Sequence, residues 1–176
     1  MKTLQTFAPE LPRDFVLRHD LRPGDLGAIV HFHGIVYAQE YGFDPTFEAY
    51  VAGPLADFII RGSDRDRLWI AERGDHLAGC VAIVAASPEI AQLRWFLVDP
   101  SARGAGLGKW LLREAVAFSE DRGYERVSLW TVRALQAAGH LYQSAGFRKV
   151  EEKPGRMWGV DVVEEKYELQ LGHSDR

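Results

Sequence analysis

The sequence predicts one α/β domain built on a mixed central sheet of about seven strands, with helices on both faces. Three observations predict this class. Short apolar segments of strand length alternate with longer segments in which apolar residues recur at helical spacing. A length of 176 residues, 47% hydrophobic and 26% charged, suits a single globular domain. Neither an internal repeat nor a linker divides the chain after residue 13.

The N-terminal part is expected to hold an arm, a strand and two helices. Residues 1–13 carry two prolines and little periodicity, so we expect an arm there and the domain over residues 14–176. Residues 15–19 alternate in polarity, like a strand. Two helices should follow, the first capped by Asp25 and ending near Tyr41, the second capped by Asp44 and interrupted at Gly53-Pro54.

The middle of the chain is expected to supply three consecutive strands. Residues 68–72 and 76–86 flank a Gly74-Asp75 pair, which predicts a hairpin. Residues 92–98 form the third strand and are apolar almost throughout their second half, as in strands buried on both faces. Cys80 lies in an apolar strand, so we expect a core cysteine.

The C-terminal part is expected to alternate helices and strands. The periodicity predicts a helix, a strand and a second helix that Gly146 ends, over residues 106–122, 126–131 and 134–145. Two closing strands, 147–153 and 162–171, should then flank a turn at Pro154-Gly155.

Charge and composition argue against several classes of partner. The formal net charge of −4 gives no broad attraction to nucleic acid or to anionic lipid. No apolar run approaches the ~20 residues that span a bilayer, and the first residues lack the apolar core of a signal peptide. The single cysteine allows no intrachain disulfide. We therefore expect a soluble, cytoplasmic protein that binds neither nucleic acid nor membrane.

The most informative segment is a glycine-rich loop between a buried strand and a long helix. It reads Arg103-Gly104-Ala105-Gly106-Leu107-Gly108 and follows a strand ending in Leu97-Val98. Glycines let the backbone approach a ligand closely and turn several N–H groups into one concavity. The positive end of the helix dipole adds to the attraction for an anion. The segment therefore predicts a site for a phosphate group.

Two common phosphate-binding loops do not fit this segment. A P-loop needs glycine five residues before Gly108 and a hydroxyl after Lys109, where this chain has Arg103 and Trp110. The dinucleotide fingerprint needs a glycine at position 109, and its strand should open a βαβ unit rather than follow a hairpin. A nucleotide-dependent enzyme is thus disfavoured.

The loop does resemble the pyrophosphate-binding motif of the GNAT superfamily of N-acetyltransferases, R-G-x-G-[LIV]-G. A second segment, from Leu141 to Phe147, is similar to the family's helix-to-strand segment, in which a tyrosine, here Tyr142, faces the sulfur of CoA. The order of elements matches the GNAT fold from about Phe15 to Leu171. Three shorter segments also resemble the acetyltransferase domains of MarR-type/GNAT fusion proteins: 37–48, 128–135 and 159–163.

The resemblance implies a direct transfer of the acetyl group from acetyl-CoA to a primary amine of a small molecule or peptide, with no metal. The loop residues Arg103 to Gly108 would bind the pyrophosphate, and the backbone at Leu97 and Val98 would bind the pantetheine arm and the thioester carbonyl. Tyr142 would be the general acid. Many relatives carry an asparagine that contacts CoA where this chain has Val132 or Leu135.

Several further residues are candidates for the acceptor side. Glu40 is a candidate general base, and Tyr41 and Asp44 border the acceptor site if they do more than cap a helix. Arg94 either meets an acidic substrate or faces solvent. His31 and His33 point in different directions on one helix, so we expect no metal site. A non-catalytic CoA-binding sensor is the alternative function, and exposed closing strands would allow a homodimer.

Overall fold

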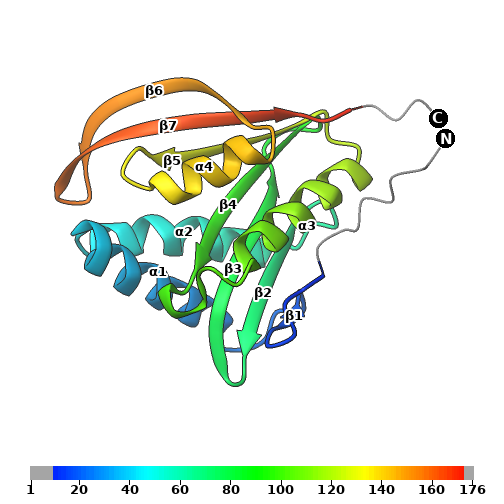
Figure 1. Ribbon diagram of the computed structural model, residues 1–176, viewed down its shortest axis with the longest axis horizontal. Helices are drawn as coiled ribbons and strands as arrows, with labels where there is room; N and C mark the ends of the chain where they lie inside the picture. Colours follow the sequence, from blue (N-terminus) through cyan, green and yellow to red (C-terminus); the bar gives the residue numbers. More distant parts are fainter. Residues whose placement is uncertain (1–9, 173–176) are drawn as a thin grey trace.

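The computed structural model describes residues 10–172 as one seven-stranded sheet with helices on both faces (Figure 1). The strands lie in the order β1-β2-β3-β4-β5-β7-β6, and only the β4–β5 pair is parallel. The predicted fold class is confirmed. The elements are β1 (Val16–Arg18), α1 (Asp25–Tyr41), α2 (Thr46–Arg61), β2 (Arg67–Arg73), β3 (His76–Ala85), β4 (Ile90–Val98), a short 3₁₀ helix (Pro100–Ala102), α3 (Leu107–Asp121), β5 (Arg126–Val132), α4 (Gln136–Ser144), β6 (Arg148–Met157) and β7 (Val160–Gln170).

Each face of the sheet is covered by its own pair of helices. α3 and α4 pack on one face, around residues such as Leu111 and Tyr142. α1 and α2 pack on the other, around Ile29 and Leu55. Figure 1 shows α3 crossing in front of the strands while α2 passes behind them. Cys80 is fully buried in the second core, as predicted. Residues 1–9 of the predicted arm lie outside the described residues, so its boundary stays a prediction.

The last hairpin turns later than predicted. β6 runs through Pro154 and Gly155, which pair with Val163 and Val162 of β7. The chain reverses at Trp158 and Gly159, whose φ angles of 53° and 80° suit a two-residue hairpin turn. Pro154 is tolerated because β6 is an edge strand, where one side of the backbone needs no partner. The predicted turn at Pro154-Gly155 was therefore wrong.

The two predicted helix caps have different outcomes. The N-cap of α2 is Pro45, one residue later than predicted, but the Asp44 carboxylate still stabilises the start of the helix. It accepts hydrogen bonds from the Thr46 backbone N–H at 3.0 Å and from the Thr46 hydroxyl. α2 then continues without a break through Pro54. The cap of α1 is Gly24, and Asp25 is already helical. The prediction that Asp25 caps α1 was wrong because an arginine binds its carboxylate instead.

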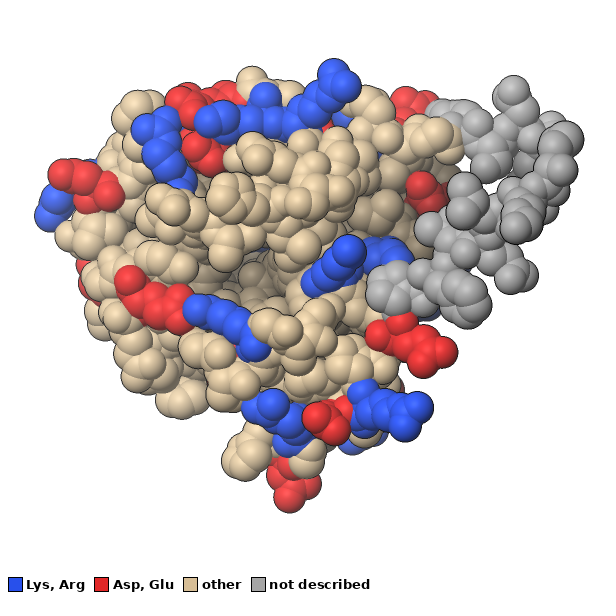
Figure 2. Space-filling model, in the orientation of Figure 1, with Lys and Arg blue, Asp and Glu red and all other residues tan. Residues whose placement is uncertain are grey.

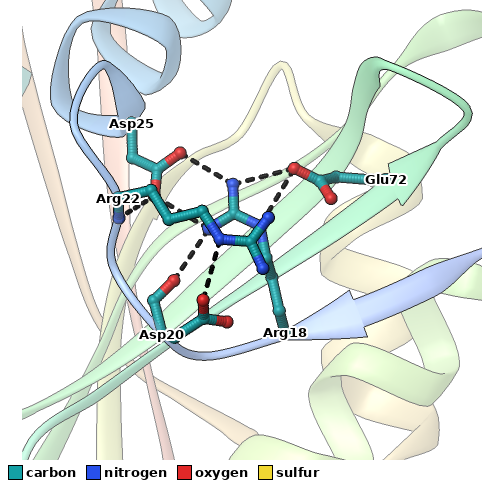
Figure 3. A network of polar contacts seen from close by, with 5 residues as sticks. All are labelled: Arg18, Asp20, Arg22, Asp25 and Glu72. Carbon is teal, nitrogen blue, oxygen red and sulfur yellow. Dashed lines mark hydrogen bonds and ion pairs between the residues drawn. The ribbon is translucent and has the colours of Figure 1, made fainter.

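That arginine, Arg18, joins three elements in one polar network (Figure 3). Its guanidinium lies 2.7 Å from Asp25 at the start of α1 and 2.8 Å from Glu72 of β2. Asp25 also accepts a 2.7 Å hydrogen bond from the Arg22 backbone N–H. The Arg18 side chain is 9% exposed, and its hydrogen bonds to the Asp25 carboxylate, together with its positive charge, lower the pKa of Asp25. The network fixes the edge strand β1 to the body of the domain.

A bulge in β4 sets the geometry of the sheet centre. Val81 of β3 faces two residues of β4, Trp95 and Phe96, because the pairing shifts between Cys80 and Ala82. Trp95 has a φ of 47°, which is rare for a bulky residue. Side chains of β4 therefore change faces: Leu93 packs toward α3, whereas Trp95 packs toward α1 and α2.

Strands β4 and β5 diverge after their first few residues. They pair only from Ile90–Gln92 to Arg126–Ser128, while β5 continues to Val132 beside β7. Figure 1 shows the two strands sharing one end and spreading apart toward the other. The edge of β4 from Leu93 to Val98 thus has no strand partner among the described residues on its β5 side. This opening is where a ligand can reach the sheet backbone.

Candidate active site

Two connected hollows occupy the opening between β4 and β5. The first, which we call the loop hollow, lies between the end of β4, the 102–109 segment and α4, and has a volume of about 390 Å³. The second, the aromatic hollow, lies between the bulge of β4, α1, α2 and the β5–β7 side, and has a volume of about 110 Å³. Tyr37, Phe96 and Leu135 line both, so the two hollows meet at these residues. Figure 2 shows this face of the molecule hollowed near its middle, with charged side chains around the rim.

The glycine-rich loop forms an anion cradle at the start of α3. Gly104 and Gly106 have φ angles of 81° and 85°, and a Cβ on either would meet no atom within 4 Å. The N–H groups of residues 104–109 donate no hydrogen bond to any residue that the structure describes. Six free donors beside the positive end of a helix, facing open space, suit a phosphate or pyrophosphate group. Five of the six loop residues predicted to bind pyrophosphate lie in this segment, and the sixth, Arg103, directly precedes it.

The backbone at the end of β4 faces the same hollow. Leu97 and Val98 both line it, as the prediction requires. The Asp99 N–H donates to Ala78 of β3 at 2.8 Å. Because N–H groups alternate between the two edges of a strand, the N–H of Val98 points away from β3 into the opening.

Glu40 lies at the end of α1 and binds the loop. Its carboxylate is 2.8 Å from the Arg103 guanidinium, and a second hydrogen bond of 3.1 Å makes the pair bidentate. Glu40 lines neither hollow. The carboxylate of this candidate base therefore lies at the phosphate cradle and not at the aromatic hollow, and its role as general base stays a prediction.

Tyr142 of α4 lies beside Phe96, one of the residues that line both hollows. Its side chain is 4% exposed and packs against Phe96, Phe147 and Tyr167, with ring centroids 5.8–6.1 Å away. It lines the aromatic hollow. Burial raises the pKa of Tyr142 well above 10, and the neighbouring Tyr37 and Tyr167 raise it further. The phenol therefore keeps its proton and can donate it.

The three remaining candidates have separate locations. Tyr41 lines the loop hollow rather than the aromatic one. Asp44 lines neither; besides capping α2, its N–H donates to Trp158 at 2.9 Å and so positions the β6–β7 turn. Arg94 lines the aromatic hollow, with its guanidinium 4.9 Å from the centre of the Trp95 ring. Of the predicted site residues, the aromatic hollow thus gathers Arg94 and Tyr142.

Aromatic rings and a few polar groups that sequence reasoning missed form the rest of the aromatic hollow. Glu164 of β7 lines it, whereas the next residue, Glu165, is buried elsewhere. The many charged residues of β7 gave no sign in the sequence of which one faces a hollow. His33 reaches it from α1, where its Nδ1 lies 2.9 Å from the Ile29 carbonyl oxygen. Burial lowers the pKa of His33 to about 4, so the ring is neutral at pH 7. The aromatic lining comprises Tyr37, Phe43, Phe47, Tyr50, Trp95, Phe96, Trp130, Tyr142 and Trp158.

Two general properties of residues 10–172 bear on function. They hold no group of three or more His, Cys, Asp or Glu side chains placed to bind a metal ion. Within the same range, every helix is too short or too polar to cross a membrane.

The comparisons with known proteins bear on this combination of a glycine-rich loop and a parted sheet. The model of the "Acetyltransferase (GNAT) family" matches residues 35–147. An N-acetyltransferase of Schizosaccharomyces pombe, itself uncharacterized, is 33% identical over 118 residues, which cover 65% of this chain and 72% of that protein. Mammalian relatives include N-acetyltransferase 8 of Rattus norvegicus, 38% identical over 57% of this chain; the chain spans about half of its length, 49%.

Solved structures show the same fold. The structure of yncA from Salmonella typhimurium with its cofactor acetyl-CoA has a TM-score of 0.74 at 17% identity, covering 93% of this chain and 97% of that one. A spermidine N-acetyltransferase from Vibrio cholerae, in complex with CoA and spermine, has a TM-score of 0.69 at 18% identity, covering 89% and 95%. Because the family model matches more than half of the sequence, the chain belongs to the GNAT acetyltransferase family.

Proposed function

We propose that the protein transfers the acetyl group of acetyl-CoA directly to a primary amine of a small molecule or peptide. The observation that carries this proposal is the anion cradle of residues 104–109, which opens into the loop hollow beside the free edge of β4. A volume of about 390 Å³ suits part of a cofactor. The mainly apolar walls, which include Leu107, Ala138 and Leu141, suit a pantetheine arm.

The residues of the cradle fit the charged end of this cosubstrate. In our proposal the N–H groups from Gly104 to Gly108 bind the pyrophosphate, and Arg103, held by Glu40, adds a cation at the rim. Glu40 is thus a positioning residue for Arg103. Leu135 offers only an apolar surface where many relatives carry an amide, and Val132 is buried. The cradle must therefore supply most of the polar contacts to the cosubstrate.

The chemistry that bound acetyl-CoA supplies is a thioester, whose carbonyl carbon the amine attacks. In this proposal the N–H of Val98 donates to the carbonyl oxygen as it gains negative charge. The Tyr142 hydroxyl gives its proton to the departing sulfur. The aromatic hollow holds the amine against the meeting point of the two hollows, and positioning of the two reactants supplies much of the rate gain.

A coupled measurement tests the proposal. The protein is incubated with acetyl-CoA and a panel of primary amines, and free thiol and acetylated product are quantified together. Equal amounts of thiol and product support acetyl transfer. Binding of acetyl-CoA without product from any amine would instead favour a CoA-binding sensor, and thiol without product would indicate hydrolysis.

A further inference from the structure

The aromatic hollow holds one cation and one anion that no described residue neutralises. Arg94 of β4 is half-buried, and its contact is with the Trp95 ring. Glu164 of β7 is also half-buried and forms no ion pair, although Lys153 lies opposite it on β6. Arg18 and Arg133, by contrast, are each held by carboxylates. Half-buried charges without partners suit a ligand that brings the opposite charges.

The location of Arg94 relates these charges to the reacting centre. Phe96, at the meeting point of the two hollows, follows Arg94 by two residues in β4. The bulge at Trp95 lies between them, so their Cα atoms are at most about 7 Å apart, which is within the reach of a guanidinium. An acceptor whose amino group lies at the meeting point can therefore place a carboxylate of the same molecule at Arg94.

The rest of the aromatic hollow suits an apolar group. Rings of α1, α2 and the β6–β7 turn form one continuous surface: Tyr37 and Phe47 are 4.6 Å apart between ring centres, and Phe47 and Trp158 are 5.0 Å apart. Two further rings are partly open to solvent, Tyr50 at 44% and Trp130 at 36% exposure. Exposed aromatic rings around a hollow provide a surface for another apolar group.

We propose that the acceptor is a free α-amino acid with an aromatic or large aliphatic side chain. This inference rests on the proposed function. The guanidinium of Arg94 binds the α-carboxylate, Glu164 faces the amino group, and the aromatic lining holds the side chain. The bound ammonium first releases one proton to solvent, because only the neutral amine can attack. The nitrogen–carbonyl carbon bond then forms, the carbonyl carbon–sulfur bond breaks, the nitrogen loses a second proton, and the departing thiolate gains one.

Other acceptor classes match the hollow less well. A polyamine would bring two or more positive charges to a hollow with a single carboxylate, Glu164, and would be repelled by Arg94. The N-terminus of a peptide has an amide where a free amino acid has its carboxylate, and so leaves Arg94 unpaired. A zwitterion satisfies both side chains at once.

Two probes that differ in one group, and a polyamine, test the inference. L-phenylalanine, L-phenylalaninamide and spermidine are compared as acceptors for the wild-type protein and for Arg94→Gln, with Arg22→Gln as the control. Arg22 is 58% exposed in the β1–α1 loop, so this control loses the same charge outside the hollows. Loss of one charge-assisted hydrogen-bonded pair corresponds to about 10- to 100-fold in kcat/KM.

The expected result is that wild type prefers phenylalanine to its amide by about 10-fold or more. Arg94→Gln should lose about 10- to 100-fold on phenylalanine but little on the amide, and Arg22→Gln should behave as wild type. An equal loss on both acceptors, or a wild-type preference for the amide or for spermidine, overturns the inference and leaves the proposed acetyltransferase intact. Failure of all three acceptors with acetyl-CoA bound also overturns it. Absence of acetyl-CoA binding instead overturns the proposed function itself.

Discussion

Replacing Tyr142 by phenylalanine removes one oxygen atom from the proposed centre and leaves the packing unchanged. The ring contacts with Phe96, Phe147 and Tyr167 survive the change. The hydroxyl has no hydrogen bond with another described residue, so no partner is left unpaired. We therefore expect no loss of thermal stability. This separates the variant from a structural defect.

The expected effect is on turnover. General acid catalysis contributes 10²–10⁴-fold in typical enzymes, and a thiolate with a pKa near ~8.5 leaves readily, so we expect about 100-fold in kcat. Affinity for acetyl-CoA, measured by calorimetry, should stay within about twofold. The raised pKa of Tyr142 also favours the neutral phenol in the folded state. Its contribution to stability is therefore present below about pH 10 and lost at higher pH. The free energy of unfolding of Tyr142→Phe should consequently fall less steeply above about pH 10 than that of the wild type.

Tyr167→Phe is the matched control. Tyr167 is buried beside Tyr142, but its hydroxyl donates to Glu165 at 3.1 Å and it does not line the aromatic hollow. This variant should lose some stability and keep its turnover. Wild-type turnover of Tyr142→Phe, under conditions where the chemical step limits the rate, would refute the general-acid role. An equal loss of turnover in both variants would indicate a packing effect.

Three further predictions follow from the cradle, the buried histidine and the arginine network. Gly106→Val should abolish acetyl-CoA binding because a side chain would project into the open cradle; Gly123→Val has similar backbone strain at the other end of α3, where φ is 74°, and should still bind in a titration. Because the pKa of His33 is lowered to about 4 in the folded state, the free energy of unfolding should fall as the pH drops from 6.5 to about 4, by about 3 kcal/mol in all. A His33→Phe variant with the same acid-dependent loss in denaturant titrations would contradict this. Asp25→Asn should destabilise the fold by roughly 1–3 kcal/mol at neutral pH, and the difference from wild type should shrink as acid protonates the wild-type carboxylate. The control Asp20→Asn, on the exposed side of the same network, should change the melting temperature little. Equal effects of the two substitutions would argue against the network.

The sequence predicted the catalytic half of the site better than the acceptor half. The cradle and Tyr142 belong to short, continuous segments whose local geometry is set by glycines and by a helix start. Glu164 and Trp158 come from the closing hairpin, whose turn was misplaced because Pro154 and Gly155 are favourable turn residues that an edge strand also tolerates. The bulge at Trp95, which turns Arg94 and Trp95 toward α1 and α2, left no pattern in a run of apolar residues. The pairing of Glu40 with Arg103 could not be foreseen, because the two residues lie 63 positions apart in the sequence.

The binding of acetyl-CoA is the most direct test of the proposed cosubstrate site. The melting temperature of the protein is measured with acetyl-CoA, NAD or ATP, each at a concentration well above micromolar. A ligand that binds only the folded state stabilises it by mass action, about 2.7 kcal/mol at 100 times the dissociation constant. We expect the melting temperature to rise by several degrees with acetyl-CoA and by much less with NAD and ATP. Equal shifts with all three, or no shift with acetyl-CoA, would contradict the assignment of residues 103–108 as the site that holds its pyrophosphate.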